Sequence, residues 1–147
     1  MTTARVRRRL PAPPGEVWRL VGDPHQLPRW WPRAVRVEGV SGRGFTLVLR
    51  SRHGREVRAD QRVLASDRPR RRAWALEVAG TPFERVFAAH EVEVRLAAED
   101  DGTRIELEQR MGLRGASRLG APLAWRSARR QLRAALDAVA EELEAGR

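Results

Sequence analysis

The 147-residue sequence has no cysteine, and its 29 basic residues exceed its 19 acidic residues to give a net charge of +10. The lack of cysteine excludes disulfide bonds, thiolate zinc sites and a cysteine nucleophile, and it agrees with a reducing, cytoplasmic location. No run of about eighteen apolar residues occurs, so we expect no membrane insertion.

The basic excess consists of arginine alone. Such a charge is typical of proteins that bind nucleic acid or an anionic surface. Arginine, alanine, glycine and proline share G/C-rich codons, however, and lysine, asparagine and tyrosine, whose codons are A/T-rich, are absent. We therefore attribute much of the excess to genome composition, and the sequence weighs against a nucleic-acid partner.

The length predicts a single domain over residues 1–147. Residues 3–10 (TARVRRRL) read as an edge strand, and no apolar stretch follows that would make the basic N-terminal segment a secretion signal. Residues 12–24 (APPGEVWRLVGDP) predict a helix, with an apolar stripe that ends at Gly22. Asp23 and Pro24 then predict the N-cap and first position of a second short helix.

Two adjacent tryptophans, Trp30 and Trp31, occur in the segment LPRWWP (residues 27–32). Neighbouring side chains point to opposite faces on a strand and about 100° apart on a helix. One core does not easily enclose both rings, so we expect at least one to face a cavity, a groove or a partner. The alternative is that both rings close a small core.

Apolar and polar residues alternate in six runs from Ala34 onward, which predicts an antiparallel sheet with one dry face. The runs are residues 34–40, 44–53, 55–66, 71–80, 84–98 and 103–113. A hairpin is predicted at EDDGT (residues 99–103). Residues 117–146 predict a long amphipathic helix that ends at Gly146, with an apolar stripe made of Trp125, Ala128, Leu132, Leu136, Val139 and Leu143.

This order predicts an α+β fold, with seven antiparallel strands curled around the long final helix and two short helices closing one end.

The segment APPGEVWRLVGDPHQLPRWWPRAVRVEGV resembles the opening of the START-like, or helix-grip, superfamily and its polyketide cyclase/dehydrase (SRPBCC) branch. The hairpin at Asp101, Gly102 and Thr103 before a strand and a long helix is similar to that branch's late signature. Members include ligand carriers, aromatase/cyclases, quinone-binding proteins and cochaperone domains. In these relatives the Trp-Trp-Pro segment forms part of the cavity mouth, so one ring would cap the pocket and the other would seal the outer wall.

Alternation assigns each strand an inner face. On a helix-grip fold that face is mostly apolar, with four polar exceptions: Ser51, Gln61, His90 and Gln109. Such a mixture is typical of a small-molecule site. We expect an apolar or aromatic ligand between the sheet and the long helix, while satisfied core residues remain the alternative for His90 and Gln61. The candidate binding residues are Trp30, Trp31, Leu47, Leu49, Ser51, Gln61, Trp74, His90, Gln109, Met111 and Trp125.

An aromatase-type polyketide cyclase/dehydrase is the second hypothesis. His90 would act as the general base and Arg72 would stabilise an enolate oxygen.

The third hypothesis is a nucleic-acid or ribosome-associated domain, which is suggested by the basic segments RVRRR, RPRRRAW and RSARRQLR. The three histidines lie on separate elements and no nucleotide motif occurs, so neither a metal nor a cofactor is predicted. The sequence leaves monomer and homodimer open.

Overall fold

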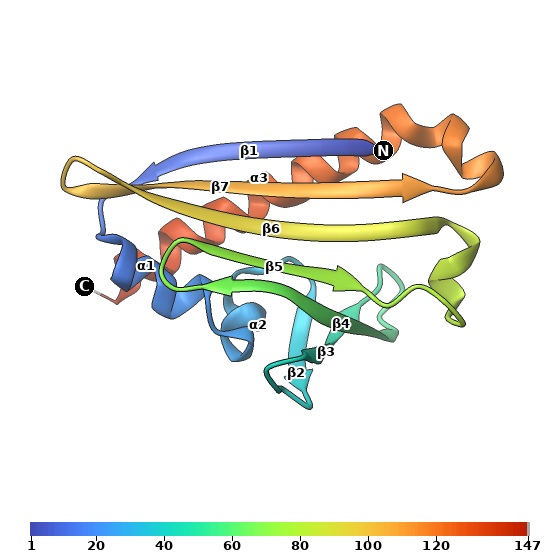
Figure 1. Ribbon diagram of the computed structural model, residues 1–147, viewed down its shortest axis with the longest axis horizontal. Coiled ribbons are helices and arrows are strands. Elements are labelled where there is room, and N and C mark those ends of the chain that lie inside the picture. The colour runs from blue at the N-terminus through green and yellow to red at the C-terminus, as the bar shows by residue number, and fades with distance from the viewer. Residues whose placement is uncertain (147) are drawn as a thin grey trace.

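Seven strands form one antiparallel sheet in the order β1-β7-β6-β5-β4-β3-β2 (Figure 1). The structure is a computed structural model and describes residues 1–146. Its strands are β1 (Thr2–Leu10), β2 (Ala34–Glu38), β3 (Gly44–Arg50), β4 (Glu56–Asp67), β5 (Arg71–Leu76), β6 (Phe87–Glu99) and β7 (Gly102–Leu113). Its helices are α1 (Pro14–Val21), η1 (Pro24–Gln26), α2 (Leu27–Trp30), η2 (Pro82–Arg85), η3 (Gly115–Gly120) and α3 (Ala121–Ala145). The predicted α+β fold, a seven-stranded sheet curled around a long C-terminal helix, is confirmed.

One face of the sheet is covered by α3, while α1 and α2 lie at one end of the sheet and η2 and η3 at the other (Figure 1). The helices bury residues that recur every three or four positions, as an amphipathic helix requires. For α3 these are Ala128, Leu132, Ala135, Leu136 and Val139. Within residues 1–146, no helix combines the length and the hydropathy needed to cross a bilayer.

The β6–β7 hairpin is fastened to the start of the chain. A Cβ atom on Gly102 would collide with the carbonyl oxygen of Leu10, so a residue without a side chain is needed where the two segments meet. The buried hydroxyl of Thr103 donates to the carbonyl oxygen of Ala12 at 2.6 Å. The Gly-Thr pair of the predicted hairpin thus holds the link between β1 and α1.

The register of β6 shifts between Phe87 and Ala89. Strict alternation with His90 on the inner face predicts Val86 inside and Phe87 outside, but the shift turns the ring of Phe87 inward against the core and onto His90. Val86, predicted inside, is 41% exposed. The outward placement of Phe87 was therefore wrong, because a bulge inserts one residue and reverses the alternation.

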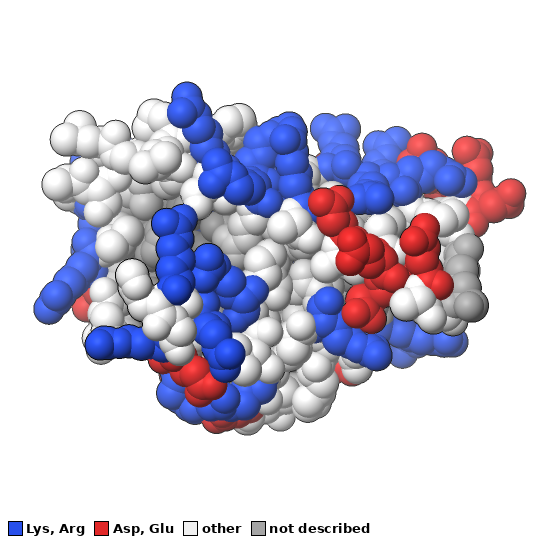
Figure 2. Space-filling model, turned by 180° about the vertical axis from the view of Figure 1, so that it is seen from behind, with Lys and Arg blue, Asp and Glu red and all other residues white. Residues whose placement is uncertain are grey.

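The charges of α3 are divided along its length. Figure 2 shows the α3 side of the molecule, with blue arginines over the first part of the helix and red acidic side chains toward its end. The predicted stripe holds from Ala128 onward, but Trp125 is 39% exposed. Its indole nitrogen donates to the carbonyl oxygen of Thr3 at 3.1 Å, because α3 begins above the edge strand β1 rather than above the core.

Candidate functional site

The inner face of the sheet carries a row of paired residues that crosses five strands. It runs from Ala4 through Gln109, Val92 and Trp74 to Val63. Polar groups on such a face are enclosed between the sheet and α3, away from water. A polar group there that has no hydrogen-bond partner in the protein therefore costs free energy. This face therefore carries the candidate site.

His90 and Gln109 contact each other on this face. The side-chain nitrogen of Gln109 lies 3.0 Å from Nε2 of His90 and 3.6 Å from the sulfur of Met111. The ring of Phe87 packs edge-on against the imidazole, with centroids 5.2 Å apart. Burial lowers the pKa of His90 to about 4, because the charged imidazolium loses its hydration. The imidazole is therefore neutral near pH 7.

Three buried polar atoms have no hydrogen-bond partner among the described residues. They are Oε1 of Gln61, Oε1 of Gln109 and Nε1 of Trp30. Leaving such a group unpaired costs about 1–3 kcal/mol. Gln61 lies on β4, two strands from His90 on β6, which is roughly 10 Å across the sheet. The interior therefore offers separated hydrogen-bonding positions within an apolar surround.

The two neighbouring tryptophans are both buried, with Trp30 2% and Trp31 5% exposed. Trp30 ends α2, and Trp31 is already in extended conformation (φ −85°, ψ 125°), so neither helix nor strand geometry governs the pair. Their rings meet edge to face at 5.7 Å, and Trp31 contacts Trp74 at 5.9 Å. One core cluster encloses both rings, as the alternative of a pair that closes a core predicts. The expectation that one core does not enclose both was wrong, because the backbone changes from helical to extended between the two residues.

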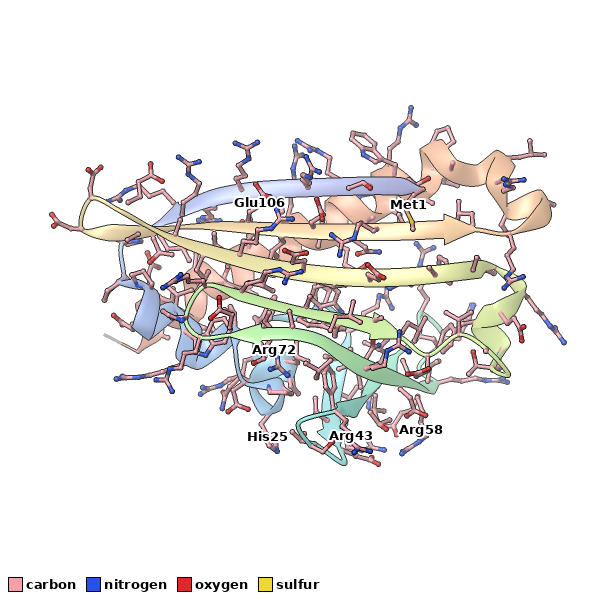
Figure 3. All side chains as sticks on the ribbon, in the orientation of Figure 1. Met1, His25, Arg43, Arg58, Arg72 and Glu106 are labelled. Atoms are coloured by element: carbon pink, nitrogen blue, oxygen red, sulfur yellow. The ribbon has the colours of Figure 1, made fainter. Side chains whose placement is uncertain are left out.

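Arg72 is buried but does not lie beside His90. It pairs with Val94 in the β5–β6 register, four residues from His90 on β6, a separation of roughly 13 Å. The guanidinium of Arg72, labelled in Figure 3, donates to the hydroxyl of Ser66 at 3.0 Å. Burial lowers the pKa of Arg72, and the charge of Asp23 opposes that effect. The predicted base and oxyanion group are thus not brought together.

The other candidate residues divide between core and surface. Leu47, Trp74 and Met111 are buried, and Leu49 packs partly buried against the core. Ser51 follows the end of β3, where its hydroxyl accepts from the backbone N–H of Arg55 at 3.1 Å. Its predicted inner position was wrong, because the strand gives way to a turn. Trp125 lies at the surface over β1.

The surface opening next to the polar pair lies between η3 and the ends of β1 and β7. It is a groove of about 270 Å³ that reaches Met111, which pairs with His90. Its rim includes Met1, Leu113 and Arg118. The groove is lined by Met111 and not by His90 or Gln109 themselves. Among the described residues, no three His, Asp or Glu side chains are placed to hold a metal ion.

Sequence reasoning missed Phe87 as a neighbour of this site and did not identify Nε1 of Trp30 as an unpaired donor. The bulge that turns Phe87 inward leaves no mark in the alternation pattern. A signal for Trp30 did exist, since a tryptophan at the end of a short buried helix must find a partner for its N–H group.

Comparisons with known proteins agree with this architecture. The family described as polyketide cyclase / dehydrase and lipid transport matches residues 1–144. A comparison with curated proteins gave no match. A START superfamily protein from Mycobacterium smegmatis has a TM-score of 0.80 at 12% identity, with 100% of both chains covered.

Two further solved structures share the fold. CalU16 from Micromonospora echinospora has 26% identity and a TM-score of 0.65, covering 96% of this chain and 73% of its own. Ara h 8.0201 has 16% identity and a TM-score of 0.75, with 97% of each chain covered. Because the family match spans nearly the whole described chain, the protein belongs to the polyketide cyclase/dehydrase and lipid transport family.

Proposed function

We propose that this protein binds a small, mainly apolar molecule carrying hydrogen-bonding groups, on the inner face between the sheet and α3. The observation that carries the proposal is the set of buried polar atoms without partners, above all the side-chain oxygens of Gln61 and Gln109. A ligand hydroxyl or amide that donates to these oxygens would remove their desolvation cost. The groove at Met111 supports access from the surface.

Displacement of a neutral fluorescent probe, N-phenyl-1-naphthylamine, tests this proposal. We expect 2,6-dihydroxynaphthalene to displace the probe more effectively than naphthalene, because its hydroxyls can pair with the buried amides. A site built to hydrogen-bond a hydroxyl discriminates strongly against an analogue that lacks it. Equal displacement by both compounds, or no probe binding at all, would contradict the proposal.

Replacing Gln61 with methionine should separate stability from binding. The side chain keeps its shape and loses an unpaired buried carbonyl, so the free energy of unfolding should rise by about 1 kcal/mol in urea denaturation. Preference for the dihydroxy compound should fall by about tenfold. Gln131→Met, on the half-buried flank of α3, is the control, with a change within about 0.5 kcal/mol. Unchanged ligand preference in Gln61→Met would remove Gln61 from the site.

A cyclase or dehydrase is the second candidate, favoured by a neutral imidazole in contact with Gln109. A pKa of about 4 makes His90 a weak base, and its distance from Arg72 gives no partner for an enolate. Solvent deuterium exchange into the methylene of a β-diketone measures this chemistry directly. Exchange that is no faster with the wild-type protein than with His90→Gln would exclude His90 as the base.

A further inference from the structure

The surface formed by η3 and the first half of α3 carries positive charge without compensation. Residues 115–136, which make up η3 and the first half of α3, contain five arginines and no aspartate or glutamate. On the outer face of the sheet, by contrast, arginines are paired, as in the ion pairs from Arg7 to Glu106 and from Arg71 to Glu93. Genome composition explains an excess of arginine, but it does not explain why carboxylates are excluded from one region.

Apolar side chains are exposed within the same surface. Leu119 is 88% exposed and Leu123 is 71% exposed. Leu123, Arg126 and Arg130 lie three and four residues apart, so they share the outward face of α3. These two arginines form no ion pair within residues 1–146 and are exposed. We call Arg118, Leu119, Leu123, Arg126 and Arg130 the α3 docking face.

The charge order of α3 opposes the helix dipole. Negative side chains stabilise the start of a helix and positive ones its end. The first turn of α3 contains no acidic residue and its last turn no basic residue, while Glu142 and Glu144 lie near its end. This distribution does not serve helix stability, and departures of this kind are expected where a surface serves function.

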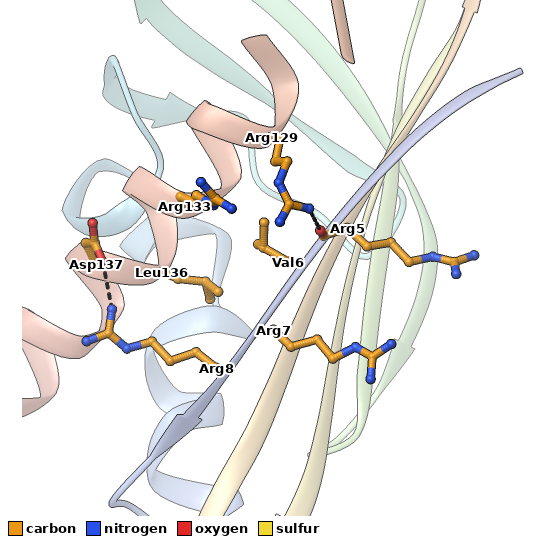
Figure 4. A pocket seen from close by; sticks show the side chains of 8 residues that line it. All are labelled: Arg5, Val6, Arg7, Arg8, Arg129, Arg133, Leu136 and Asp137. Atoms are coloured by element: carbon orange, nitrogen blue, oxygen red, sulfur yellow. Dashed lines mark hydrogen bonds and ion pairs between the residues drawn. The ribbon is translucent and has the colours of Figure 1, made fainter. Parts of the chain in front are cut away.

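A groove beside the docking face could take an anionic group. It has a volume of about 490 Å³ between β1 and α3, with Val6 and Leu136 in its lining. Figure 4 shows Arg129 and Arg133 over this groove, whereas Arg8 is held by Asp137 at 2.7 Å. Arg133 has no ion-pair partner among the described residues, and a free guanidinium matches the geometry of a phosphate.

We propose that the α3 docking face binds the surface of an anionic phospholipid bilayer, with the exposed leucines entering the interface and the arginines contacting phosphates. Apolar side chains next to basic ones are the pattern of interfacial membrane binding. Exposed leucines would add nothing to the binding of RNA. A second copy would set arginines against arginines. The groove at Met111 includes Arg118, so this groove lies beside the docking face. The docking face does not depend on what the interior binds.

Co-sedimentation with vesicles tests the proposal on the full chain. Binding should require phosphatidylglycerol mixed into phosphatidylcholine and should weaken with added salt. Each arginine near such a surface contributes roughly fivefold in affinity, so Arg126→Gln/Arg130→Gln should weaken binding by about 30-fold. Leu119→Ser/Leu123→Ser, which keeps the charge, should weaken it by about tenfold or more.

The control is Arg52→Gln/Arg55→Gln in the exposed turn after β3, which removes the same charge elsewhere. It should bind vesicles within about twofold of the wild type. Equal losses in the two arginine variants would show that net charge alone drives binding and would overturn the proposal. The proposal would also be overturned if the protein did not bind vesicles. It would be overturned as well if the leucine substitutions left vesicle binding unchanged, because the exposed leucines would then contribute nothing, as expected for an RNA partner.

Discussion

Arg110→Met should destabilise the protein by about 2–4 kcal/mol, the largest effect that we expect from a single substitution on the outer face of the sheet. Glu93 and Glu108 stand directly opposite each other on β6 and β7, and both are only 3% exposed. Arg110 contacts Glu93 at 3.2 Å, Glu91 at 3.0 Å and also Glu108. Without its guanidinium, two facing carboxylates would remain buried with fewer counter-charges.

The pKa of Glu93 shows how strongly the network of Arg71, Arg95 and Arg110 stabilises the negative charge of this carboxylate. Burial alone would raise that pKa, but hydrogen bonds from Arg71 and Arg95, together with Arg110, lower it to about 2. A depressed carboxyl pKa stabilises the fold above the unfolded value of 4.5, and that stability is lost as the pH falls toward 2. The network therefore stabilises the fold under neutral conditions and fails in acid.

Urea denaturation near neutral pH compares Arg110→Met with a matched exposed pair. Arg62 contacts Glu77 at 3.0 Å, with both side chains about half exposed, and Arg62→Met should cost less than about 1 kcal/mol. If both variants lost the same stability, the outer network would contribute no more than an ordinary surface ion pair.

The second large effect is a loss of stability in mild acid caused by His90. The pKa of His90 is about 4 in the folded protein, compared with 6.5 for an unperturbed histidine in the unfolded chain. Between these two pH values the unfolded chain binds a proton at His90 and the folded chain does not. Stability from this group is complete above pH 6.5 and is lost as the pH falls toward 4. Between pH 7 and pH 5 the loss should be about 2 kcal/mol.

Urea denaturation at these two pH values, which lie above the range where Glu93 titrates, measures this loss. His90→Gln should flatten the dependence, whatever its stability at neutral pH, because the titrating ring is gone. His53→Gln, in an exposed turn, should retain the wild-type slope. A wild-type slope in His90→Gln would contradict the buried, neutral imidazole.

Alternation and helical spacing were sufficient to predict the strands and the final helix, because a sheet with one dry face must repeat every two residues and an amphipathic helix every three or four. The errors arose where backbone geometry changes locally. Phe87 follows a bulge, Ser51 follows the end of a strand, and Trp31 follows the last turn of α2.

Part of the candidate site followed from the sequence, and part needed the register. His90, Gln61 and Gln109 were identified as polar residues on an apolar face, and the structure places His90 and Gln109 in contact. The separation of Arg72 from His90 depends on how β5 and β6 align. The cross-strand pair of Glu93 and Glu108 depends likewise on alignment, and alternation within one strand does not give it.

Native mass spectrometry of the freshly purified protein tests the central claim most directly, because it detects a bound molecule without knowledge of its identity. We expect a discrete small adduct that is lost on denaturation, with a mass that fits the interior beside Met111, and a weaker adduct in Gln61→Met. A bare chain from native cells that also fails to take up added 2,6-dihydroxynaphthalene would contradict ligand binding on the inner face.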